Sequence, residues 1–336
     1  MSKKSSPFLR IEDHFSEIAE IPVITVFENR LPVTPRFTIA IPTFKRAETL
    51  REALESVLNQ DTSEQFEVIV SDNNPERNDE TETLMAEYAD VPNLTYIKNS
   101  NNLGMVGNWN RLPLLTRGKY MVILHDDDCI APFFLSSATV LLEKCPDADL
   151  LQFAKIHEKK YEFQRDALHA ERFRIVDNIL GNALSAPTGT IYLRDTLLKA
   201  GGWNPHFYPS HDYCFDCLLM CHGYRVYASP LKATFYRIDI NVSLKKETQV
   251  GCMIIDTNLR HVLFRHIGFP GFVRRRFIEH YNEIKIKRLG LTQADIKPIL
   301  VGQYRAITKN IAGWLTYRII LIQSRFMHSM DKIFKA

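Results

Sequence analysis

Residues 37–58 read FTIAIPTFKRAETLREALESVL, and this stretch decides the fold that the sequence predicts. Its first six residues form an apolar run with the length and composition of a buried strand. Beyond this run, apolar side chains recur at helical spacing. They are Leu50, Ala53, Leu54, Val57 and Leu58. A buried strand that leads directly into an amphipathic helix forms the first half of a βαβ unit.

The same alternation continues along the chain to residue 128. We expect strands at 66–72, 94–99 and 119–128, and helices at 81–89 and 108–116. This order predicts an α/β fold with a mainly parallel central sheet and flanking helices. In such sheets, ligands bind beyond the carboxyl ends of the strands. Polar residues gather at those ends, namely Thr43, Lys45 and Arg46, and residues 71–74, 99–104 and 125–128.

The 336 residues are 45% hydrophobic, which suffices for one large core or for a catalytic domain with a smaller appendage. No window reaches about 18 uncharged apolar residues, so we expect no membrane-spanning helix. Six cysteines are too sparse for a secreted disulfide framework, which favours the reducing cytosol. Pro22, Pro32 and Pro35 predict an irregular N-terminal extension over residues 1–36.

The net charge of +3 is unevenly distributed. Residues 245–336 hold 17 Lys and Arg against 6 Asp and Glu, so the last quarter of the chain is basic. Basic and large apolar residues alternate there, notably at 260–290 and 314–336. Two interpretations stay open: helices that lie on an anionic membrane surface, or a helical appendage packed on the catalytic domain. No readout motif supports nucleic-acid binding.

Asp126, Asp127 and Asp128 follow the apolar strand residues MVIL. Adjacent carboxylates repel one another, so burying them is unfavourable unless a cation or strong donors compensate. A divalent ion such as Mn²⁺ or Mg²⁺, which also binds diphosphate oxygens, suits this oxygen-rich cluster. The alternative is a solvated acidic turn that precedes a helix. The position of the cluster, at the edge where the other polar strand ends meet, favours the metal site.

Five segments in this order resemble inverting glycosyltransferase family 2, which has the GT-A fold. They are IPTFKRAETLREALESVLNQ (41–60), VIVSDNN (68–74), NLGMVGNWN (102–110), LHDDDCIAPFFL (124–135) and LLKAGGWNPHFYPSHDYCFDCLLMCHGYRVY (197–227). The resemblance covers about residues 37–244. It implies a Rossmann-like GT-A catalytic domain with a nucleotide-sugar half at 37–130 and an acceptor half at 131–244, followed by a basic, mainly helical region at 245–336.

The resemblance implies a nucleotide-sugar site built from residues at the strand ends. They are Pro42, Thr43, Arg46, Asp72, Asn102, Gly104, Asn108, Asp126, Asp127 and Arg237. Asp72 would accept a hydrogen bond from the nucleotide base, and Arg237 would contact the diphosphate. Asn102, Gly104 and Asn108 match a loop that closes around the nucleotide and the sugar. Glycine at position 104 permits close backbone approach.

For the metal ion, the resemblance implies Asp128 as a direct ligand and Asp126 as a residue nearer the ribose or the sugar. The family often reads D-x-D-D at this point, and His125 then stands at the first acid. The choice of metal ligands among the three aspartates therefore stays open.

Inverting transfer needs a carboxylate that takes the proton of the attacking hydroxyl. In SHDY, Asp212 matches the aspartate of the family's Glu-Asp pair, and His211 stands in place of the glutamate. Asp212 could instead be an acid that favours a helix N-terminus, and Asp216 is the second candidate for the base. For the acceptor, the resemblance implies His211 and Trp203, although burial of Trp203 in the core is an equal alternative.

Three cysteines in the same segment, Cys214, Cys217 and Cys221, lie near two histidines. Their i, i+3, i+7 spacing places the sulfurs along one helical stripe, as in a helix that faces the core. We therefore predict core residues here in preference to a zinc site.

We predict a metal-dependent inverting glycosyltransferase of the hexosyltransferase type that uses a nucleotide-sugar, with UDP the family's commonest nucleotide. The acceptor would be a saccharide or lipid-linked saccharide, as in bacterial surface polysaccharide synthesis. The enzyme would be cytoplasmic, with peripheral contact to the inner face of the cytoplasmic membrane as an open alternative. A sugar nucleotidyltransferase is disfavoured because IPTFKRAET lacks glycine after the first strand. A non-catalytic nucleotide-sugar-binding or assembly protein stays open because His211 and Asp239 replace expected residues.

Overall fold

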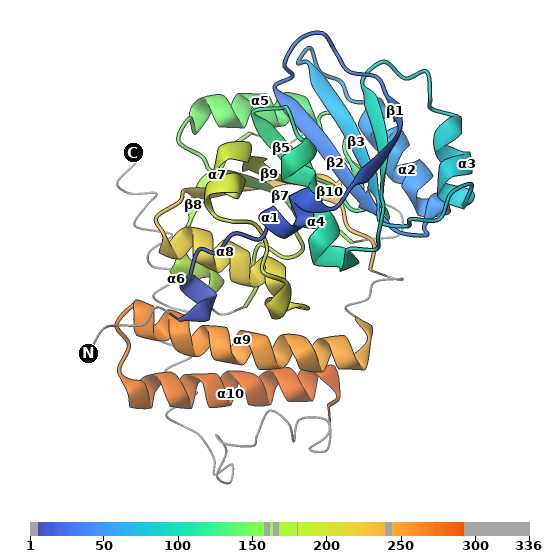
Figure 1. Cartoon of the computed structure of the whole chain (residues 1–336). Coiled ribbons are helices and arrows are strands. Elements are labelled where there is room, and N and C mark those ends of the chain that lie inside the picture. The colour runs from blue at the N-terminus through green and yellow to red at the C-terminus, as the bar shows by residue number, and fades with distance from the viewer. Residues whose placement is uncertain (1–5, 158–161, 164–167, 180, 239–243, 292–336) are drawn as a thin grey trace.

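The computed structural model describes residues 6–157, 162–163, 168–179, 181–238 and 244–291. Its strands form one ten-stranded sheet in the order β1-β4-β3-β2-β5-β9-β7-β10-β6, and β8 pairs with β10 beside this path. Helices cover the sheet (Figure 1). Two separate apolar clusters lie against it, so that Ile39 and Ile41 pack into one cluster and Ala40 into the other. The predicted α/β class is confirmed.

The parallel part of the sheet consists of the four strands that the sequence predicts. They are β2 (Phe37–Thr43), β3 (Phe66–Asp72), β4 (Leu94–Asn99) and β5 (Tyr120–Ile123). β2 pairs in parallel with β3 and β5, and β3 pairs in parallel with β4. Every residue of β2 is buried because the sheet is covered on both faces. β5 ends at Ile123, so the predicted strand 119–128 is too long and the acidic cluster lies in a turn.

The N-terminal segment contains a strand that the sequence analysis missed. β1 (Val23–Glu28) pairs antiparallel with β4 and forms an edge of the sheet. The prolines at positions 22 and 32 flank this strand instead of interrupting it. The described part of the segment also contains η1 (Pro7–Leu9) and α1 (Ser16–Glu20). The expectation of an irregular extension is therefore wrong for residues 23–28.

The second half of the sheet mixes strand directions. Its strands are β6 (Cys129–Ile130), β7 (Leu150–Ile156), β8 (Glu171–Phe173), β9 (Thr190–Leu193) and β10 (Val226–Phe235). β9 runs antiparallel to both β5 and β7, whereas β10 runs parallel to β7. β10 also pairs antiparallel with β6, and this pairing brings the chain after β10 beside the acidic turn.

The flanking helices bury the faces that the apolar spacing predicts. In α2 (Ala47–Leu58), the buried side chains are Leu50, Ala53, Leu54 and Val57. The other helices of this part are α3 (Glu80–Ala86), α4 (Gly104–Leu115), α5 (Phe134–Lys144), α6 (Ile175–Asn178), α7 (Arg194–Lys199), η2 (Pro205–Phe207) and α8 (His211–Cys221). α4 begins four residues before the predicted helix, so the segment expected to form a loop around a ligand is partly helical.

Two long helices follow the sheet, as predicted for the basic region. α9 (Lys246–His266) and α10 (Gly271–Leu289) lie side by side below α8 (Figure 1). Cys214 and Cys217 of α8 are buried against the apolar side chains of both helices, which confirms the prediction that the cysteine stripe belongs to the core. No helix in residues 6–291, within the described ranges, is long and apolar enough to cross a membrane. The predicted basic segment 314–336 lies outside the described residues.

A buried polar cluster ties α8 to the long helices. Ser210, directly before α8, donates a hydrogen bond of 2.8 Å to Asp256 of α9. The other oxygen of Asp256 lies 3.0 Å from Nζ of Lys285 in α10 and 3.6 Å from Nη2 of Arg260. The position of the α8 N-terminus therefore depends on contacts with the C-terminal region.

A second buried ion cluster lies at the carboxyl ends of β3 and β4. Nζ of Lys98 lies 2.9 Å from Oδ2 of Asp72 and 3.0 Å from Oδ1 of Asp79, and Lys98 and Asp72 are both fully buried. Tyr96 donates a hydrogen bond of 2.9 Å to Asp72, and the backbone N–H of Asn74 donates another. These contacts compensate the buried carboxylate and fix the adjacent strand ends.

We predict that Lys98→Met lowers the free energy of unfolding at pH 7 by about 3 kcal/mol, because Asp72 would lose the cation that compensates its buried charge. Burial already raises the pKa of Asp72 above its usual value, and loss of Lys98 would raise it further. A carboxyl with a raised folded-state pKa contributes stability that is lost as the pH rises through that pKa, so the deficit of the variant should shrink towards pH 4.

Urea unfolding at pH 7 and pH 4.5 measures this difference between the wild type and the variant. Lys232→Met, which replaces an exposed lysine of β10, serves as the control and should change stability little. An equal deficit at both pH values would contradict the assigned role of Lys98.

Candidate functional site

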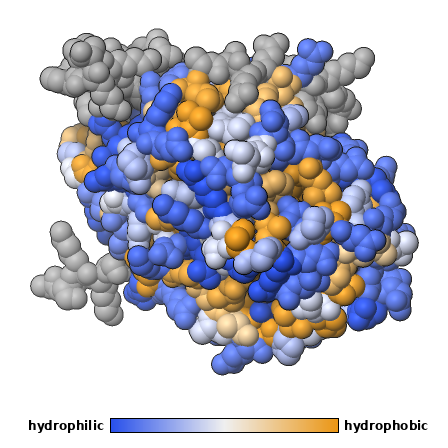
Figure 2. Space-filling view, turned by 90° about the horizontal axis from the view of Figure 1, so that it is seen from above, coloured by the Kyte–Doolittle hydropathy of each residue, from blue (hydrophilic) through white to orange (hydrophobic). Residues whose placement is uncertain are grey.

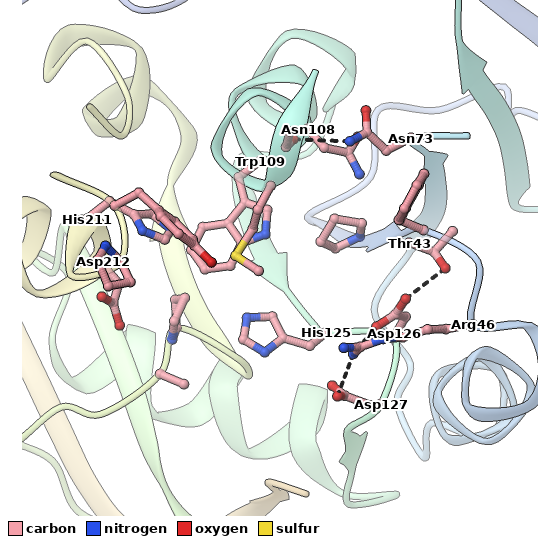
Figure 3. Close-up of a pocket in the computed structure, with 18 of the residues that line it drawn as sticks. Thr43, Arg46, Asn73, Asn108, Trp109, His125, Asp126, Asp127, His211 and Asp212 are labelled. Carbon is pink, nitrogen blue, oxygen red and sulfur yellow. Dashed lines mark hydrogen bonds and ion pairs between the residues drawn. The ribbon is translucent and has the colours of Figure 1, made fainter. Parts of the chain in front are cut away.

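A cavity of about 460 Å³ lies at the carboxyl ends of the parallel strands, where the sequence predicts the site. Most of its polar lining comes from the loop after β2, the acidic turn after β5 and the N-termini of α4 and α8 (Figure 3). The predicted site residues that line it are Pro42, Thr43, Arg46, Asn102, Gly104, Asn108, Asp126, Asp127, His211 and Asp212. Asp72, Asp128, Trp203 and Arg237 do not line it.

The acidic turn is held by donors from the end of β2 and the loop that follows it. Thr43 donates a hydrogen bond of 2.8 Å to Oδ2 of Asp126. Nη1 of Arg46 lies 3.3 Å from Oδ1 of Asp126 and 2.7 Å from Oδ2 of Asp127. Both carboxylates are buried, with 6% of each residue exposed. Thr43 and Arg46 therefore compensate the buried negative charge of Asp126 and Asp127, and the segment is not a solvated acidic turn.

Burial raises the pKa of Asp126 to about 6, although the Arg46 guanidinium opposes this shift. Burial also raises the pKa of Asp127, and the neighbouring Asp128 carboxylate adds to this effect. A cation close to these oxygens would favour the ionised form of both groups.

Three residues of the turn fit a metal ion. Atoms of His125, Asp127 and Asp128 that can serve as ligands lie within 4.8 Å of one another. Asp128 is fully buried, and its Oδ2 has no hydrogen-bond partner among the described residues. Oδ1 of Asp128 accepts a hydrogen bond of 2.7 Å from the backbone N–H of Arg237. Asp128 thus belongs to the group that could hold a metal ion, as predicted. Asp126 does not belong to this group, because its oxygens bond to Thr43 and Arg46. His125 belongs to the group in addition.

An asparagine cluster forms the wall beside β3 and β4. Asn73 donates hydrogen bonds to Asn102, at 2.8 Å, and to the carbonyl oxygen of Gly104. Asn108 lies in α4, not in a loop, and its amide bonds to Ser71. Gly104 has a φ of 69° with no protein atom near the Cβ position, so its backbone conformation, not crowding, favours glycine.

Trp109 and two histidines form an aromatic wall that the sequence analysis missed. The Trp109 ring stacks on His125, with centroids 5.3 Å apart, and contacts His211 at 4.7 Å (Figure 3). Only 3% of the His211 surface is exposed, and neither ring nitrogen has a hydrogen-bond partner among the described residues. Burial lowers the pKa of His211 to about 3, so this ring is neutral at physiological pH. The NWN segment contains the signal, because its tryptophan lies one residue after the predicted ligand Asn108.

Asp212 lines the cavity on the side opposite the acidic turn (Figure 3). Its Oδ2 accepts a hydrogen bond of 3.2 Å from Asn182, and burial raises its pKa to about 6. The second candidate, Asp216, is buried one turn further along α8 and does not line the cavity. Of these two acids, only Asp212 can contact a ligand in the cavity.

Three predicted contacts need correction. Asp72 is fully buried and its oxygens are bonded to Tyr96, Lys98 and Asn74, so it is not available to a base in the cavity. The Arg237 side chain bonds to the carbonyl oxygen of Asp127 and to Glu52 and thus supports the acidic turn from outside.

Trp203 is fully buried in the apolar cluster beneath α4 and α8, so the core alternative is correct and the acceptor assignment is wrong. Asp239, which replaces an expected residue, lies outside the described residues.

We predict that Trp203→Ala lowers the free energy of unfolding by about 4 kcal/mol, because it removes a large side chain that contacts the rings of Trp109, Tyr192 and Phe215. Chemical denaturation measures the loss. Trp203→Phe keeps an aromatic ring in the cluster and should retain more than half of that energy. Normal stability of Trp203→Ala would mean that the residue does not belong to the core.

Residues 38–202 match the family described as Glycosyl transferase family 2. One similar protein is the GalNAc(5)-diNAcBac-PP-undecaprenol beta-1,3-glucosyltransferase of Campylobacter jejuni. It is 33% identical over 96 residues, which make up 28% of this chain and 30% of that protein. The chain spans between 30% and 63% of the length of the curated relatives that it matches.

Two solved structures have a similar fold. S. aureus TarS 1-349 in complex with UDP-GlcNAc gives a TM-score of 0.57 at 16% identity, over 85% of this chain and 79% of that chain. The mannosyltransferase PcManGT from Pyrobaculum calidifontis, in complex with GDP-Man and Mn²⁺, gives 0.53 at 16% identity, over 94% and 92%. These likenesses concern the fold, and they agree with the predicted GT-A architecture.

Proposed function

The chain belongs to glycosyltransferase family 2 through residues 38–202, and from this premise we propose that it transfers a sugar from a nucleotide-sugar to an acceptor hydroxyl with inversion. One observation carries the proposal: Asp212 and the acidic turn line a single cavity from opposite sides (Figure 3). Inverting displacement needs this arrangement, because the base and the leaving diphosphate lie on opposite faces of the anomeric carbon.

On the donor side, the proposed ligand is a nucleoside diphosphate sugar, with UDP as the nucleotide. TarS binds UDP-GlcNAc and PcManGT binds GDP-Man, so the fold accommodates more than one base. Arg46 lies at the cavity wall with a third of its side chain exposed, and it would bind diphosphate oxygens beside the acidic turn. The amides of Asn73 and Asn102 offer donors and acceptors to the nucleotide.

His125, Asp127 and Asp128 would hold a divalent metal ion, in keeping with the Mn²⁺ of the PcManGT complex. When bound, such an ion supplies positive charge that stabilises the departing diphosphate. The backbone N–H of Arg237 holds Asp128 in place for this role, and Arg46 and Thr43 orient the neighbouring Asp126.

On the acceptor side, Asp212 takes the proton from the attacking hydroxyl as the new glycosidic bond forms. The bond between the anomeric carbon and the diphosphate oxygen breaks in the same step. Asn182 orients the carboxylate, and the neutral imidazole of His211 can bond to an acceptor hydroxyl. Thr248 and Cys252 of α9 also line this end of the cavity, so the C-terminal region contributes to the acceptor site.

The proposed acceptor is a saccharide, free or lipid-linked, in surface polysaccharide synthesis. The name of the Campylobacter jejuni relative includes an undecaprenol-linked substrate, which supports a lipid-linked acceptor. Three basic residues of α10, Arg274, Arg275 and Arg276, follow shortly after Phe272, which is 76% exposed. This combination suits peripheral contact with an anionic membrane. On the face seen in Figure 2, separate hydrophobic patches lie among hydrophilic residues.

Two other functions share part of this evidence. A sugar nucleotidyltransferase is disfavoured because the loop after β2 carries no glycine. A non-catalytic nucleotide-sugar-binding protein would use the same cavity without turnover. Thermal unfolding with a panel of nucleotide-sugars and Mn²⁺, followed by measurement of nucleoside diphosphate release, separates these cases, because a true donor stabilises the folded state by mass action.

We predict that Asp212→Asn lowers kcat about a thousandfold with little change in donor affinity, because the variant cannot accept the hydroxyl proton. Asp216→Asn is the matched control on the same helix and should retain most of the activity, since its side chain lies outside the cavity. Thermal unfolding of both variants verifies their folding. Similar losses in both variants would contradict the assignment of the base to Asp212.

The pH dependence should follow the ionisation of Asp212. Burial raises the pKa of this group to about 6, and a base acts only in its ionised form. We therefore expect kcat/KM to be constant above about pH 7 and to fall tenfold per pH unit below about pH 6. A rate that stays constant down to pH 4.5 would exclude Asp212 as the base.

A further inference from the structure

We propose that His125 is a metal ligand and that it makes this site prefer Mn²⁺ over Mg²⁺. This inference rests on the proposed function, because it concerns the ion that would neutralise the donor diphosphate. It goes beyond that function in assigning a ligand and a metal preference to a histidine at a position where the sequence comparison leads us to expect an acid.

The imidazole of His125 lies among the possible ligand atoms of the acidic turn. Nδ1 of His125 lies 3.3 Å from Oδ2 of Asp128, and Asp127 completes a group of ligand atoms within 4.8 Å. An ion about 2.1 Å from each of two ligand atoms fits between atoms at such a separation. With Asp127 as the third protein ligand, the ion would keep coordination positions for diphosphate oxygens and water.

Two polar atoms at this site lack hydrogen-bond partners among the described residues. Oδ2 of Asp128 and Nε2 of His125 are buried without a hydrogen bond among the described residues. The Asp128 residue has no exposed surface at all. A carboxylate oxygen buried without a partner is unfavourable unless a ligand satisfies it. This Asp128 oxygen has no hydrogen bond and lies 3.3 Å from Nδ1 of His125, so one bound cation would compensate the carboxylate and engage the imidazole.

The surrounding residues hold the proposed ligands in place before an ion binds. The His125 ring stacks on Trp109 with an interplanar angle of 25°, which restricts its rotation. Its backbone N–H donates to Oγ1 of Thr188, and Oδ1 of Asp128 is fixed by the backbone N–H of Arg237. Ligands fixed by their neighbours lose little freedom on binding, which favours a defined metal geometry.

The preference follows from the chemistry of the ligand set. Mg²⁺ prefers oxygen ligands in near-ideal octahedral geometry and gives up its water reluctantly. Imidazole nitrogen suits transition metals, whereas carboxylate oxygen suits both Mg²⁺ and Mn²⁺. The described residues therefore favour Mn²⁺.

The opposing interpretation is a simple ion pair between a protonated His125 and Asp128. In that case the imidazole would compensate the buried carboxylate by itself and would not touch the ion. The two interpretations differ in what happens to direct metal binding when the histidine is replaced, so turnover is not needed to separate them.

The test uses the full chain and the metal ion alone. Binding of Mn²⁺ is measured from the loss of the electron paramagnetic resonance signal of the free ion, and Mg²⁺ affinity is measured by competition. We expect wild-type protein to bind Mn²⁺ at least about tenfold more tightly than Mg²⁺. His125→Asp should reduce this ratio about tenfold, because it replaces nitrogen by oxygen. Electron spin echo modulation should show ¹⁴N coupling from a bound imidazole in the wild type and lose it in the variant.

Two further variants keep the test decisive. His125→Phe preserves a ring that can stack on Trp109 but removes the nitrogen, so it should weaken Mn²⁺ binding about tenfold or more without loss of thermal stability. His206→Asp, at an exposed histidine outside the cavity, should behave as wild type. The inference is overturned if the Mn²⁺ to Mg²⁺ ratio and the ¹⁴N coupling do not change in His125→Asp.

These results separate the inference from the proposed function. Sugar transfer by a wild type that binds both ions equally, without ¹⁴N coupling, would leave the transferase proposal standing and remove the role of His125. Tight Mn²⁺ binding with ¹⁴N coupling, but no release of nucleoside diphosphate from any donor, would do the reverse.

Discussion

The burial of three consecutive carboxylates at the end of β5 is the constraint on which the rest of the site depends. Adjacent negative charges can be buried only where nearby groups compensate them. Thr43 does so from the end of β2, Arg46 from the loop after β2, and the backbone N–H of Arg237 from the chain after β10. The acidic turn thus joins the parallel half of the sheet to its mixed half, and cation binding would complete the same compensation.

The opposite side of the cavity depends on a different part of the chain. Asp212 and His211 open α8, and Ser210 before them is bonded to Asp256 of α9. Because Asp256 also binds Lys285, the long C-terminal helices fix the helix that carries the proposed base. The basic region also contributes Thr248 and Cys252 to the lining of the cavity, so it is more than an appendage packed on the sheet.

The prediction of the fold succeeded where the pattern is local. β2 was predictable because it has a continuous apolar run, and α2 because its apolar side chains recur at helical spacing. Both patterns reflect the burial of most of these side chains in one apolar cluster. β1 was missed because an edge strand buries less of its surface and flanking prolines resemble loop signals. The length of β5 was overestimated because the acidic residues directly follow the apolar run and were assigned to the strand, although aspartate favours turns.

By itself, the sequence determined the order of strands and helices and the edge of the sheet at which polar groups meet, because these follow from periodicity along the chain. Only the tertiary structure decided which of those groups face the cavity. Asp72 and Asn73 are neighbours in the sequence, yet Asp72 forms a buried ion pair with Lys98 whereas Asn73 lines the cavity. The direction and the partners of each side chain are set by residues distant in the sequence, and no local pattern records them.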